Sequence, residues 1–509
     1  MNFKHSLREL DPAFSETSKP EPFSQPELLL WNQGLAEELG LTDKLLNHEQ
    51  ERCAFFSGQK SAVNSSSYSF VYAGHQFGQF SGRLGDGRAH MLGEWTAKNG
   101  QLVDVQLKGS GRTPFSRAGD GLCALAPALR EYLMGEAMHA LGVPTTRSLS
   151  VVATGDDVMR EGLVPGAVVS RVAQSHLRVG TFQWFAATEQ HEALAKLCAY
   201  TLKRHYPSYI LSEEALEKDH AKFPEQILKL LDAVIDKQIE LVCHWQRVGF
   251  IHGVMNTDNC SIAGETIDFG PCAMLGSYHP EAVYSSIDRN GRYAFGQQPS
   301  MMNWNLARLA ESLLPLLHKD VEQALALCRP LIESVPDRFD QAYYHMLAKK
   351  FGLSSFIKST PNKTPTQSQR SLINDMLKHM QINELDYTLS FRQLKRYLEG
   401  KLSEPEIATL KQYFSGDSDK QNSLECWLNE VSADKNTAIS LMAVSNPELI
   451  PRNYFVEHAL DAAVKNDDLS LIKDYMLAWS EPYKERKDSF KLLGSKAEFD
   501  TNYRTFCGT

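Results

Sequence analysis

Hydrophobic and polar residues alternate most regularly over Leu102–Lys108, where the sequence reads LVDVQLK. Val103, Val105 and Leu107 would fall on one face of a strand, and the polar residues between them on the other. The pattern therefore predicts a half-buried strand. Lys108 would end the strand on its polar face.

Two helices are indicated by a different, helical spacing of apolar residues. Ala124–Leu141 is rich in Ala and Leu and is followed by Gly142 and Pro144, which favour a helix end. A longer helix is predicted to end at Gly249. Its apolar side would be formed by Ile227, Leu231, Val234, Leu241 and Trp245.

The remaining pattern completes a coarse architecture. A helix is predicted around Glu27–Leu39, and strands are predicted at Ser148–Ala153 and Ala167–Val172. The polar, proline-bearing segment Ser359–Ser371 is interpreted as a loop or linker. The chain after it, Leu372–Thr509, is predicted to be wholly helical. The sequence thus predicts an α+β chain with a strand-rich half, a helix-rich half and a helical tail.

Composition and charge narrow the possible classes of protein. The 509 residues carry a formal net charge of −9, which does not favour overall attraction to nucleic acid or to an anionic membrane. No apolar run approaches the roughly 18 residues that a membrane span needs. The first residues lack the apolar core of a secretory signal. We therefore expect a cytoplasmic protein. Independently of these features, we expect a monomer.

The cysteines do not indicate a metal site. Nine are present, and none forms a Cys-x-x-Cys pair, so a zinc ribbon or a thioredoxin-type site is not supported. Reduced thiols, as in a cytosolic protein, are the default interpretation.

The most informative string follows the long predicted helix. His252–Asn259 and then Asp268–Gly270 match the spacing of the catalytic loop and the Asp-Phe-Gly of kinase-type phosphotransferases. In those enzymes the Asn and the Asp hold the metal ions that bridge the nucleotide phosphates. A hairpin turn at Ala263–Glu265 would bring Asn259 and Asp268 to one Mg²⁺ or Mn²⁺.

One position departs from the kinase pattern. Val254 stands where a kinase carries its aspartate base, and valine cannot accept a proton. Asp258 is the nearest carboxylate and could deprotonate or orient a hydroxyl nucleophile. The alternative is that Asp258 only caps a loop and that the protein is catalytically inactive.

Lys108 is a candidate phosphate-binding lysine. Such a lysine pairs with a glutamate on the following helix, and Glu131 and Glu136 are both available. Five residues separate them, about 140° around a helix, so only one can face Lys108. We prefer Glu131, because Glu136 lies nearer the helix end; the alternative is that both are solvated surface residues.

Glycine and arginine recur near this strand. Gly82–Arg88, Gly109–Arg112 and Gly119–Gly121 offer backbone N–H groups, and the first two also offer arginines, to an anion. Arg171 and Arg178 could also reach a polyphosphate. Each element alone could be an ordinary turn or a surface ion pair.

Several of these strings together resemble the SelO/YdiU family, from about residue 5 to the end of the chain. The strings occur in order and include Tyr72–Gly78, Leu84–Arg88, Lys108–Gly111, Gln174–Arg178, His252–Asn259, Gly291–Tyr293 and Trp304–Leu306.

The resemblance implies a protein-kinase-like bilobal fold of the α+β class. An N-terminal extension (1–65) would precede a strand-rich N-lobe (66–185) and a helical C-lobe (186–350), and a C-terminal helical region (351–509) would follow. The family is described as protein adenylyltransferases, which transfer AMP from ATP to Ser, Thr or Tyr hydroxyls of proteins. ATP would lie reversed relative to ordinary kinases. Some members are reported to use UTP with manganese, so UMP transfer stays open.

The resemblance also assigns roles to residues. Asn259 and Asp268 would bind the metal, Asp258 would be the proton acceptor, and Lys108 would pair with Glu131. Contacts to ATP would come from Gly85, Gly87, Arg88, Lys108, Asp120, Gly121, Arg171, Arg178 and Asp268.

Two cysteines suggest a regulatory hypothesis. Cys272 follows the Asp-Phe-Gly, and Cys507 stands near the C-terminus, where eukaryotic relatives carry selenocysteine. A disulfide between them could fasten the tail over the active site under redox control. Two unrelated free thiols are the equally weighted alternative.

Two other functions remain open from the sequence. One is phosphoryl transfer by a kinase, against which Val254 argues. The other is a non-catalytic nucleotide-binding scaffold. A hydrolase is set aside, because neither Gly-x-Ser-x-Gly nor His-Glu-x-x-His occurs.

Overall fold

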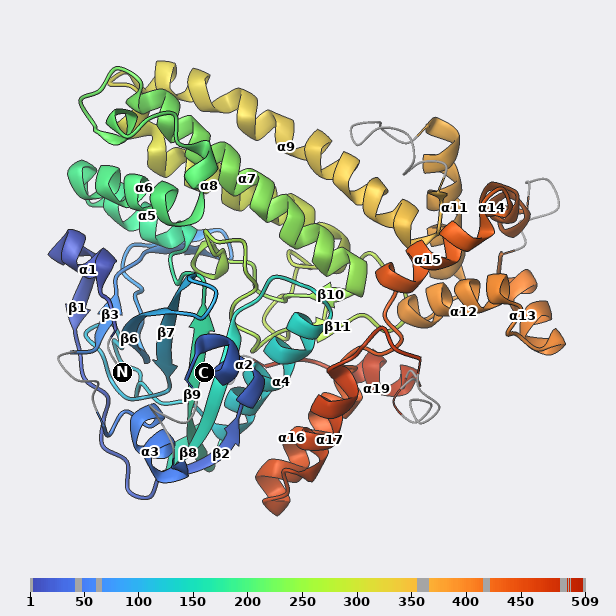
Figure 1. Ribbon diagram of the computed structural model, residues 1–509, viewed down its shortest axis with the longest axis horizontal. Helices are drawn as coiled ribbons and strands as arrows, with labels where there is room; N and C mark the ends of the chain where they lie inside the picture. The colour runs from blue at the N-terminus through green and yellow to red at the C-terminus, as the bar shows by residue number, and fades with distance from the viewer. Residues whose placement is uncertain are drawn as a thin grey trace.

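The computed structural model describes residues 3–41, 48–60, 66–354, 366–414, 422–485, 492, 494 and 496–506. The fold is α+β, as predicted, and is built on one seven-stranded antiparallel sheet (Figure 1). The strand order is β1-β3-β6-β7-β9-β8-β2. The strands are β1 (Ser15–Thr17), β2 (Glu27–Trp31), β3 (Tyr68–Phe70), β6 (Ala89–Thr96), β7 (Leu102–Lys108), β8 (Arg147–Met159) and β9 (Leu163–Ala173).

Three smaller sets of elements complete the sheet-bearing part. A hairpin of β4 (Gly74–Gln76) and β5 (Gln79–Ser81) stands apart from the sheet. The short helix α1 (Ser6–Leu10) lies near the first strand, and α2 (Gln33–Leu39) and α3 (Glu49–Phe56) lie near β8 and β2. Helix α4 (Leu125–Ala140) packs on β8 and β9.

Both faces of strand β7 are buried, which corrects the prediction of a half-buried strand. On one face, Val105 and Leu107 pack in an apolar cluster with Phe55 of α3 and Leu35 of α2. The opposite face carries three buried polar residues, which are paired with other polar groups instead of with water. They are Asp104, Gln106 and Lys108.

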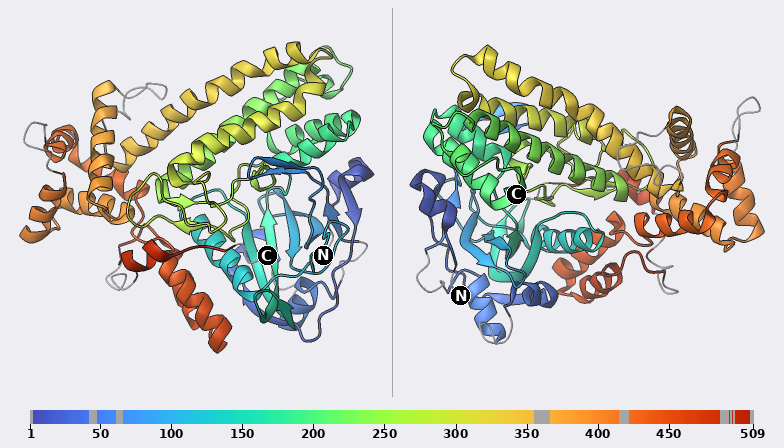
Figure 2. Two further views of the ribbon diagram at one scale, coloured as in Figure 1. Left: turned by 180° about the vertical axis from the view of Figure 1, so that it is seen from behind. Right: turned by 45° about the horizontal axis from the view of Figure 1, so that its top comes forward.

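The helical part lies above the sheet in Figure 1. Figure 2 shows from behind that its three longest helices run alongside one another. The longest helix predicted from the sequence, α7, ends where Gly249 adopts a left-handed φ of 76°. A short ladder of β10 (Phe250–Ile251) and β11 (Ala273–Met274) follows it. The helices are α5 (Val179–Ala187), α6 (His191–His205), α7 (Phe223–Val248), α8 (Gln298–Leu317) and α9 (Val321–Lys350).

The C-terminal helices form two groups (Figure 1). One group extends beyond the end of α9, and the other lies beside the sheet, where α16 and α17 pack on α4. The first group contains α11 (Gln367–Ile382), α12 (Tyr387–Glu399), α13 (Glu404–Phe414), α14 (Ser423–Ser432) and α15 (Lys435–Ser445). The second contains α16 (Asn453–Asn466), α17 (Ser470–Trp479) and α19 (Ala497–Asn502).

The helix predicted for Glu27–Leu39 is wrong in its first half. Glu27–Trp31 is strand β2, which pairs with β8 and buries Leu30. The helix begins only at Gln33, because the Asn32 side chain accepts a hydrogen bond from Leu35 N at 3.0 Å and caps it.

Two predictions for the C-terminal part also need correction. Most of the predicted linker lies outside the described residues, but its end, from Gln367, is the first turn of α11, which Thr366 caps. The tail is not wholly helical, because Tyr503–Phe506 is extended and Thr505 forms a parallel bridge with Ser285. No helix within the described ranges is both long enough and apolar enough to cross a membrane.

Candidate active site

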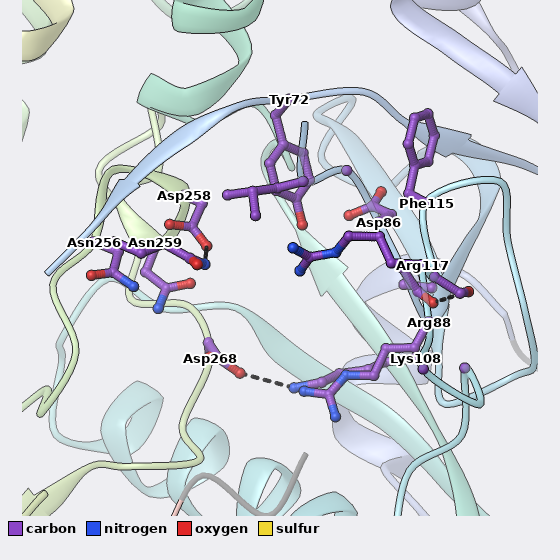
Figure 3. Close-up of a pocket in the computed structure, with 18 of the residues that line it drawn as sticks. Tyr72, Asp86, Arg88, Lys108, Phe115, Arg117, Asn256, Asp258, Asn259 and Asp268 are labelled. Atoms are coloured by element: carbon purple, nitrogen blue, oxygen red, sulfur yellow. Dashed lines mark hydrogen bonds and ion pairs between the residues drawn. The ribbon is translucent and has the colours of Figure 1, made fainter. Parts of the chain in front are cut away.

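A pocket of about 830 Å³ opens between the sheet and the segment that follows α7 (Figure 3). Its wall is formed by the glycine-rich segments around residues 84–89 and 112–122, by β7 and β9, and by residues 254–268. All the residues predicted to contact ATP or the metal contribute to this lining. They are Gly85, Gly87, Arg88, Lys108, Asp120, Gly121, Arg171, Arg178, Asn259 and Asp268.

Lys108 lies at the centre of a buried network of charges. Its Nζ donates to Glu131 Oε2 at 2.6 Å and to Asp268 Oδ1 at 3.0 Å. The other oxygen of Glu131 accepts from Arg171 Nε at 2.6 Å. Burial alone would raise the pKa of Glu131, but Arg171 and Lys108 lower it to about 2. Glu131 is therefore an anion shared by two cations.

The alternative partner, Glu136, faces away from Lys108. Its carboxylate binds Arg147, with Nε–Oε1 at 2.7 Å and Nη2–Oε2 at 2.6 Å. Both glutamates of α4 are thus buried ion-pair partners, whereas the alternative from the sequence had both in solvent. Of the two, Glu131 is the one that meets Lys108.

Asp268 is held in an unusual backbone conformation. Its φ is 66°, a left-handed value that is uncommon for a residue other than glycine. The preceding carbonyl, Ile267 O, lies 2.9 Å from His252 Nε2. This contact connects the segment to the first residue of the string His252–Asn259. Burial would raise the pKa of Asp268, but Lys108, Arg88 and Arg171 lower it below its ordinary value. The carboxylate is therefore ionised and aimed at the lysine (Figure 3).

The chain turns before Asp268, as predicted, but the two arms of the turn do not form the predicted hairpin. Gly264 N does donate back to Ser261 O at 3.2 Å, so the chain turns here. However, Ser261 pairs with Arg178 and Thr266 pairs with Thr145, so the two arms of the turn do not pair with each other. Neighbouring loops, not a hairpin, bring Asn259 and Asp268 to one pocket.

Asp258 lies on the short 3₁₀ turn Thr257–Asn259 and lines the same pocket. Burial raises its pKa to about 6, against the opposing effect of Arg178. Oδ2 accepts from Gln76 Nε2 at 3.2 Å, and Oδ1 has no hydrogen-bond partner among the described residues. Val254, where a kinase has its base, also lines the pocket. Asp258 is therefore a buried carboxylate with a raised pKa and one oxygen free of hydrogen bonds to the described residues.

Asn259 donates its amide hydrogen to Val254 O at 3.1 Å. One of the two amide hydrogens is thus occupied, and the amide oxygen is the atom that can act as a ligand. Together with Asp268, it offers the pocket two oxygen donors. Mg²⁺ and Mn²⁺ accept a few such donors and complete their shells with phosphate oxygens and water. Within the described ranges, no group of three or more His, Cys, Asp or Glu is arranged so that it could hold a metal ion.

Arg178 lines the pocket beside Asp258 and Asp86. It caps α5 and donates from Nη1 to Asp258 O at 3.2 Å. Its guanidinium stacks over the Tyr72 ring at 4.4 Å and lies 3.7 Å from Asp86 Oδ1. Asp86 is itself buried and accepts from Gln106 Nε2 at 3.0 Å. Asp86 belongs to the string Leu84–Arg88, but the sequence alone assigned it no role.

The glycines of the pocket wall stand where side chains would collide. A Cβ on Gly85 would lie 2.3 Å from the Phe115 ring, and one on Gly121 would lie 2.3 Å from the Gly111 carbonyl carbon. Asp120 differs from its assignment in one respect. Its carboxylate is paired with Arg160 at 2.7 Å, a residue that the sequence did not single out.

Three further arginines line the pocket, and their charges are not neutralised by a carboxylate of the described residues. Within the part of the chain that the structure describes, none of them forms an ion pair with a carboxylate. Arg117 was missed from the sequence, although its place five residues after Arg112 in a glycine-bearing stretch was a usable signal. The three are Arg88, Arg112 and Arg117 (Arg88 and Arg117 are labelled in Figure 3).

The predicted link between Cys272 and Cys507 stays a prediction, because Cys507 lies outside the described residues. Cys272 is buried, and its thiol donates to Phe269 O at 3.1 Å. Burial raises the pKa of this thiol to about 12, so in this conformation it is not a reactive thiolate. The nearby tail does reach this region, because Thr505 Oγ1 donates to Pro271 O at 2.7 Å.

Comparison with known proteins gives consistent results over the whole chain. A family model described as "Protein adenylyltransferase SelO" matches residues 1–480. A protein nucleotidyltransferase YdiU of Teredinibacter turnerae is 45% identical, with 100% of both chains covered. Proteins of the same name from Anoxybacillus flavithermus and Geobacillus kaustophilus are each 43% identical over 100% of this chain and 99% of theirs.

Proposed function

This chain belongs to the SelO family of protein adenylyltransferases and is an enzyme of that class, and we propose that its pocket binds ATP and transfers AMP to Ser, Thr or Tyr hydroxyls of other proteins. The observation that carries the proposal is the position of Lys108 in the pocket. It lies between Glu131 and Asp268, with arginines that lack carboxylate partners on the same wall.

The charges of the pocket support a polyphosphate as its ligand. Lys108 and Arg171 are held in place by Glu131, while Arg88, Arg112 and Arg117 are free to pair with added anions. Planar guanidinium groups bind phosphate oxygens in pairs. We assign the triphosphate to this basic wall and to the backbone of the turns at Gly85, Gly87, Asp120 and Gly121.

Asn259 and Asp268 would hold Mg²⁺ or Mn²⁺. When bound, such an ion neutralises negative charge on the phosphate oxygens. Arg178, which contacts Asp258 O and lies near Asp86, is placed to do the same.

The proposed transfer is an in-line displacement at the α-phosphorus. The acceptor oxygen forms a new bond to phosphorus while the bond to the bridging oxygen breaks, and pyrophosphate leaves with that electron pair. Asp258 takes the proton of the acceptor hydroxyl. ATP would lie with its α-phosphate toward Asp258, reversed relative to ordinary kinases. Val254 cannot take a proton, which disfavours γ-phosphoryl transfer at the kinase position.

We also propose that the fold is a protein-kinase-like bilobal one. The sheet with α4 would form the N-lobe and α5–α9 the C-lobe, close to the boundaries 66–185 and 186–350. Residues 1–65 would then add to the N-lobe, since β1 and β2 form the two edges of its sheet. The part after residue 350 would be a helical region that supports both lobes, and the protein would act as a monomer.

The deciding experiment asks which phosphate of ATP enters the protein substrate. The purified chain, alone and added to a cell lysate, is incubated with Mg²⁺ and either α-³²P-ATP or γ-³²P-ATP. We expect only the α-label to enter protein, with a mass gain of about 329 Da on the modified chain, and no label with Asp268→Ala. Entry of the γ-label with a gain of about 80 Da would show a kinase instead. No label from either nucleotide would favour a binding scaffold.

The nucleotide and the metal are tested in the same assay. Parallel reactions with ATP or α-³²P-UTP, each with Mg²⁺ or Mn²⁺, measure which pair gives the highest initial rate. We expect ATP with Mg²⁺ to support transfer. UTP with Mn²⁺ is the second pair, and UMP transfer faster than AMP transfer would reassign the co-substrate.

A further inference from the structure

The hairpin β4–β5 lies directly on the turn that carries Asp258. Its backbone binds the turn at two points, with His75 N donating to Thr257 Oγ1 at 2.6 Å and Phe77 N donating to Asn256 Oδ1 at 3.0 Å. The hairpin is separate from the main sheet, so these contacts, together with its contacts with α5, hold it in place. Gln76, which lies between His75 and Phe77 in the sequence, is therefore placed next to Asp258.

The tip of the hairpin is held in a single conformation. Phe77 has a left-handed φ of 51°, which a residue other than glycine keeps only where its surroundings impose it. Its ring packs against Tyr293 with centroids 5.3 Å apart. Tyr293 in turn donates its hydroxyl hydrogen to Asn256 Oδ1 at 2.8 Å. The tip and the turn thus share one set of contacts, which leaves Gln76 little freedom.

Gln76 and Gly74 surround the carboxylate of Asp258. Gln76 Nε2 donates to Oδ2 at 3.2 Å, and only the amide nitrogen can fill this role beside an ionised carboxylate. On the other side, a Cβ on Gly74 would lie 3.1 Å from Oδ1, so the hairpin approaches this oxygen closely without binding it. Oδ1 has no hydrogen-bond partner in the described part of the chain. One oxygen is therefore fixed, and the other is left to accept a proton.

We propose that Gln76 is a positioning residue for the transfer reaction, because its amide fixes one oxygen of Asp258 and so aims the carboxylate at the acceptor hydroxyl. This inference rests on the proposed function, in which Asp258 is the proton acceptor. A neutral amide suits the task, since it orients a carboxylate without cancelling its charge as an arginine or lysine would. Gln76 would act on the acceptor step and not on ATP binding.

The test compares three variants in the full chain with α-³²P-ATP and Mg²⁺. We expect Gln76→Leu to slow label transfer at saturating ATP by about 10- to 100-fold, with the KM for ATP unchanged. This loss reaches only the lower limit of the roughly 10²–10⁴-fold that a general base contributes, because Asp258 itself remains. Gln76→Glu keeps the size of the side chain but replaces the donor with a like charge, so it should be at least as slow. Gln79→Leu is the matched control, because Gln79 is exposed and pairs with Gln76 across the hairpin without contacting Asp258. It should transfer at the wild-type rate.

Several results would overturn the proposal. A wild-type rate in Gln76→Glu would show that the residue serves only as a spacer. Equal losses in Gln76→Leu and Gln79→Leu would show that the hairpin matters only as a structure. A raised KM with an unchanged rate would move Gln76 to ATP binding. Failure of the proposed function itself is distinct, since the wild-type chain would then transfer no α-label at all.

Discussion

Glu131 balances two buried cations with one carboxylate. Lys108 and Arg171 each bind a different oxygen of it at 2.6 Å, and the side chain of Glu131 is only 3% exposed. Burying a charge is costly unless it is paired, so each member of this trio depends on the others. The trio also fixes the lysine and the arginine in the direction of the pocket before any ligand arrives.

We therefore expect Glu131→Gln to damage both folding and function. Arg171 would lose its carboxylate partner and Lys108 would keep only Asp268, which should cost about 3–5 kcal/mol in the free energy of unfolding. The α-label transfer rate should fall by more than about 100-fold. Chemical denaturation and the transfer assay measure the two effects.

Glu136→Gln is the control on the same helix. It breaks the pair with Arg147 outside the pocket, so the protein should lose stability but keep its ATP affinity and transfer rate per folded molecule. If Glu136→Gln abolished transfer as fully as Glu131→Gln, the special place of Glu131 would be refuted.

Glu265, which does not line the pocket, should make the free energy of unfolding depend on pH. It is buried, and Oε2 accepts from Gln174 N at 2.9 Å. Burial raises its pKa from 4.5 to about 8. The folded protein thus keeps a proton that the unfolded chain has already released, so stability from this group is full below pH 4.5 and is lost as the pH rises through about 8.

Glu265→Gln should remove this dependence. The free energy of unfolding of the wild type, relative to the variant, should fall by a few kcal/mol between about pH 5 and about pH 8, at about 1.4 kcal/mol for each unit of pKa shift. Urea titrations at several pH values give this difference, and other titrating groups cancel in it. Parallel curves for the two proteins would show that Glu265 is ionised in the fold.

At the scale of elements, sequence patterns located β7, α4 and α7 but did not determine their surroundings. The alternation in Leu102–Lys108 gave the strand, yet it could not show that the polar face is covered by α4 and by residues such as His176, whose backbone N–H binds Asp104. Likewise, the run Glu27–Trp31 is compatible with either a helix or a strand, and the pairing with β8 decides it. Partners distant in sequence supply that information.

The glycine-bearing turns depend on close backbone contact between two segments. Gly121 has a φ of 74°, and a Cβ there would meet backbone atoms of Gly111 and Arg112 at 2.3–2.5 Å. Gly121→Ala should therefore push the two segments apart, at a local cost of about 1–2 kcal/mol from the φ angle alone. We expect ATP affinity, measured by calorimetry, to fall by more than about 10-fold.

Gly119→Ala provides the comparison within the same turn. Its added Cβ would have one close neighbour, Ser116 O at 3.1 Å, and its φ is not left-handed. It should weaken ATP binding much less than Gly121→Ala does. Equal losses would mean that flexibility of the turn, and not its close packing, governs binding.

At the scale of the whole molecule, the C-terminal helices support the helix that carries Glu131. Arg130 of α4 binds Glu457 of α16, and Tyr503 Oη lies 3.2 Å from the same arginine. The side chain of Arg130 is only 11% exposed. The sequence placed these helices in a separate tail and gave no sign that they touch α4, because such contacts leave no mark in local periodicity.

Glu457→Ala should accordingly destabilise the protein. Because the arginine is nearly buried but Glu457 is 30% exposed, we expect a loss of about 1–3 kcal/mol in the free energy of unfolding. Asp461→Ala, on the same helix, breaks only an exposed pair with Lys465 and should change stability by no more than about 0.5 kcal/mol. Thermal or urea denaturation measures the stability of the two variants. Similar losses in both would show that the ion pair with Arg130 of α4 adds no stability beyond that of helix α16 itself.

The candidate site was largely within reach of the sequence, because its residues stand in short strings with recognisable spacing. Lys108, Asn259 and Asp268 line one pocket, as those strings suggested. The hairpin residue Gln76 and the pairing of Asp120 with Arg160 were not within reach. Each of these joins segments that are separated by 40 or more residues, and only the folded chain brings them together.

The double covering of α4 limits how the enzyme can be switched off. In kinase-type enzymes, an outward swing of the helix that bears the glutamate separates it from the lysine and silences the site. Here β8 and β9 lie against one side of that helix, and α16 and α17 lie against another. Such a swing would first have to peel the C-terminal helices away, so the lysine and its glutamate stay coupled for as long as those helices remain docked.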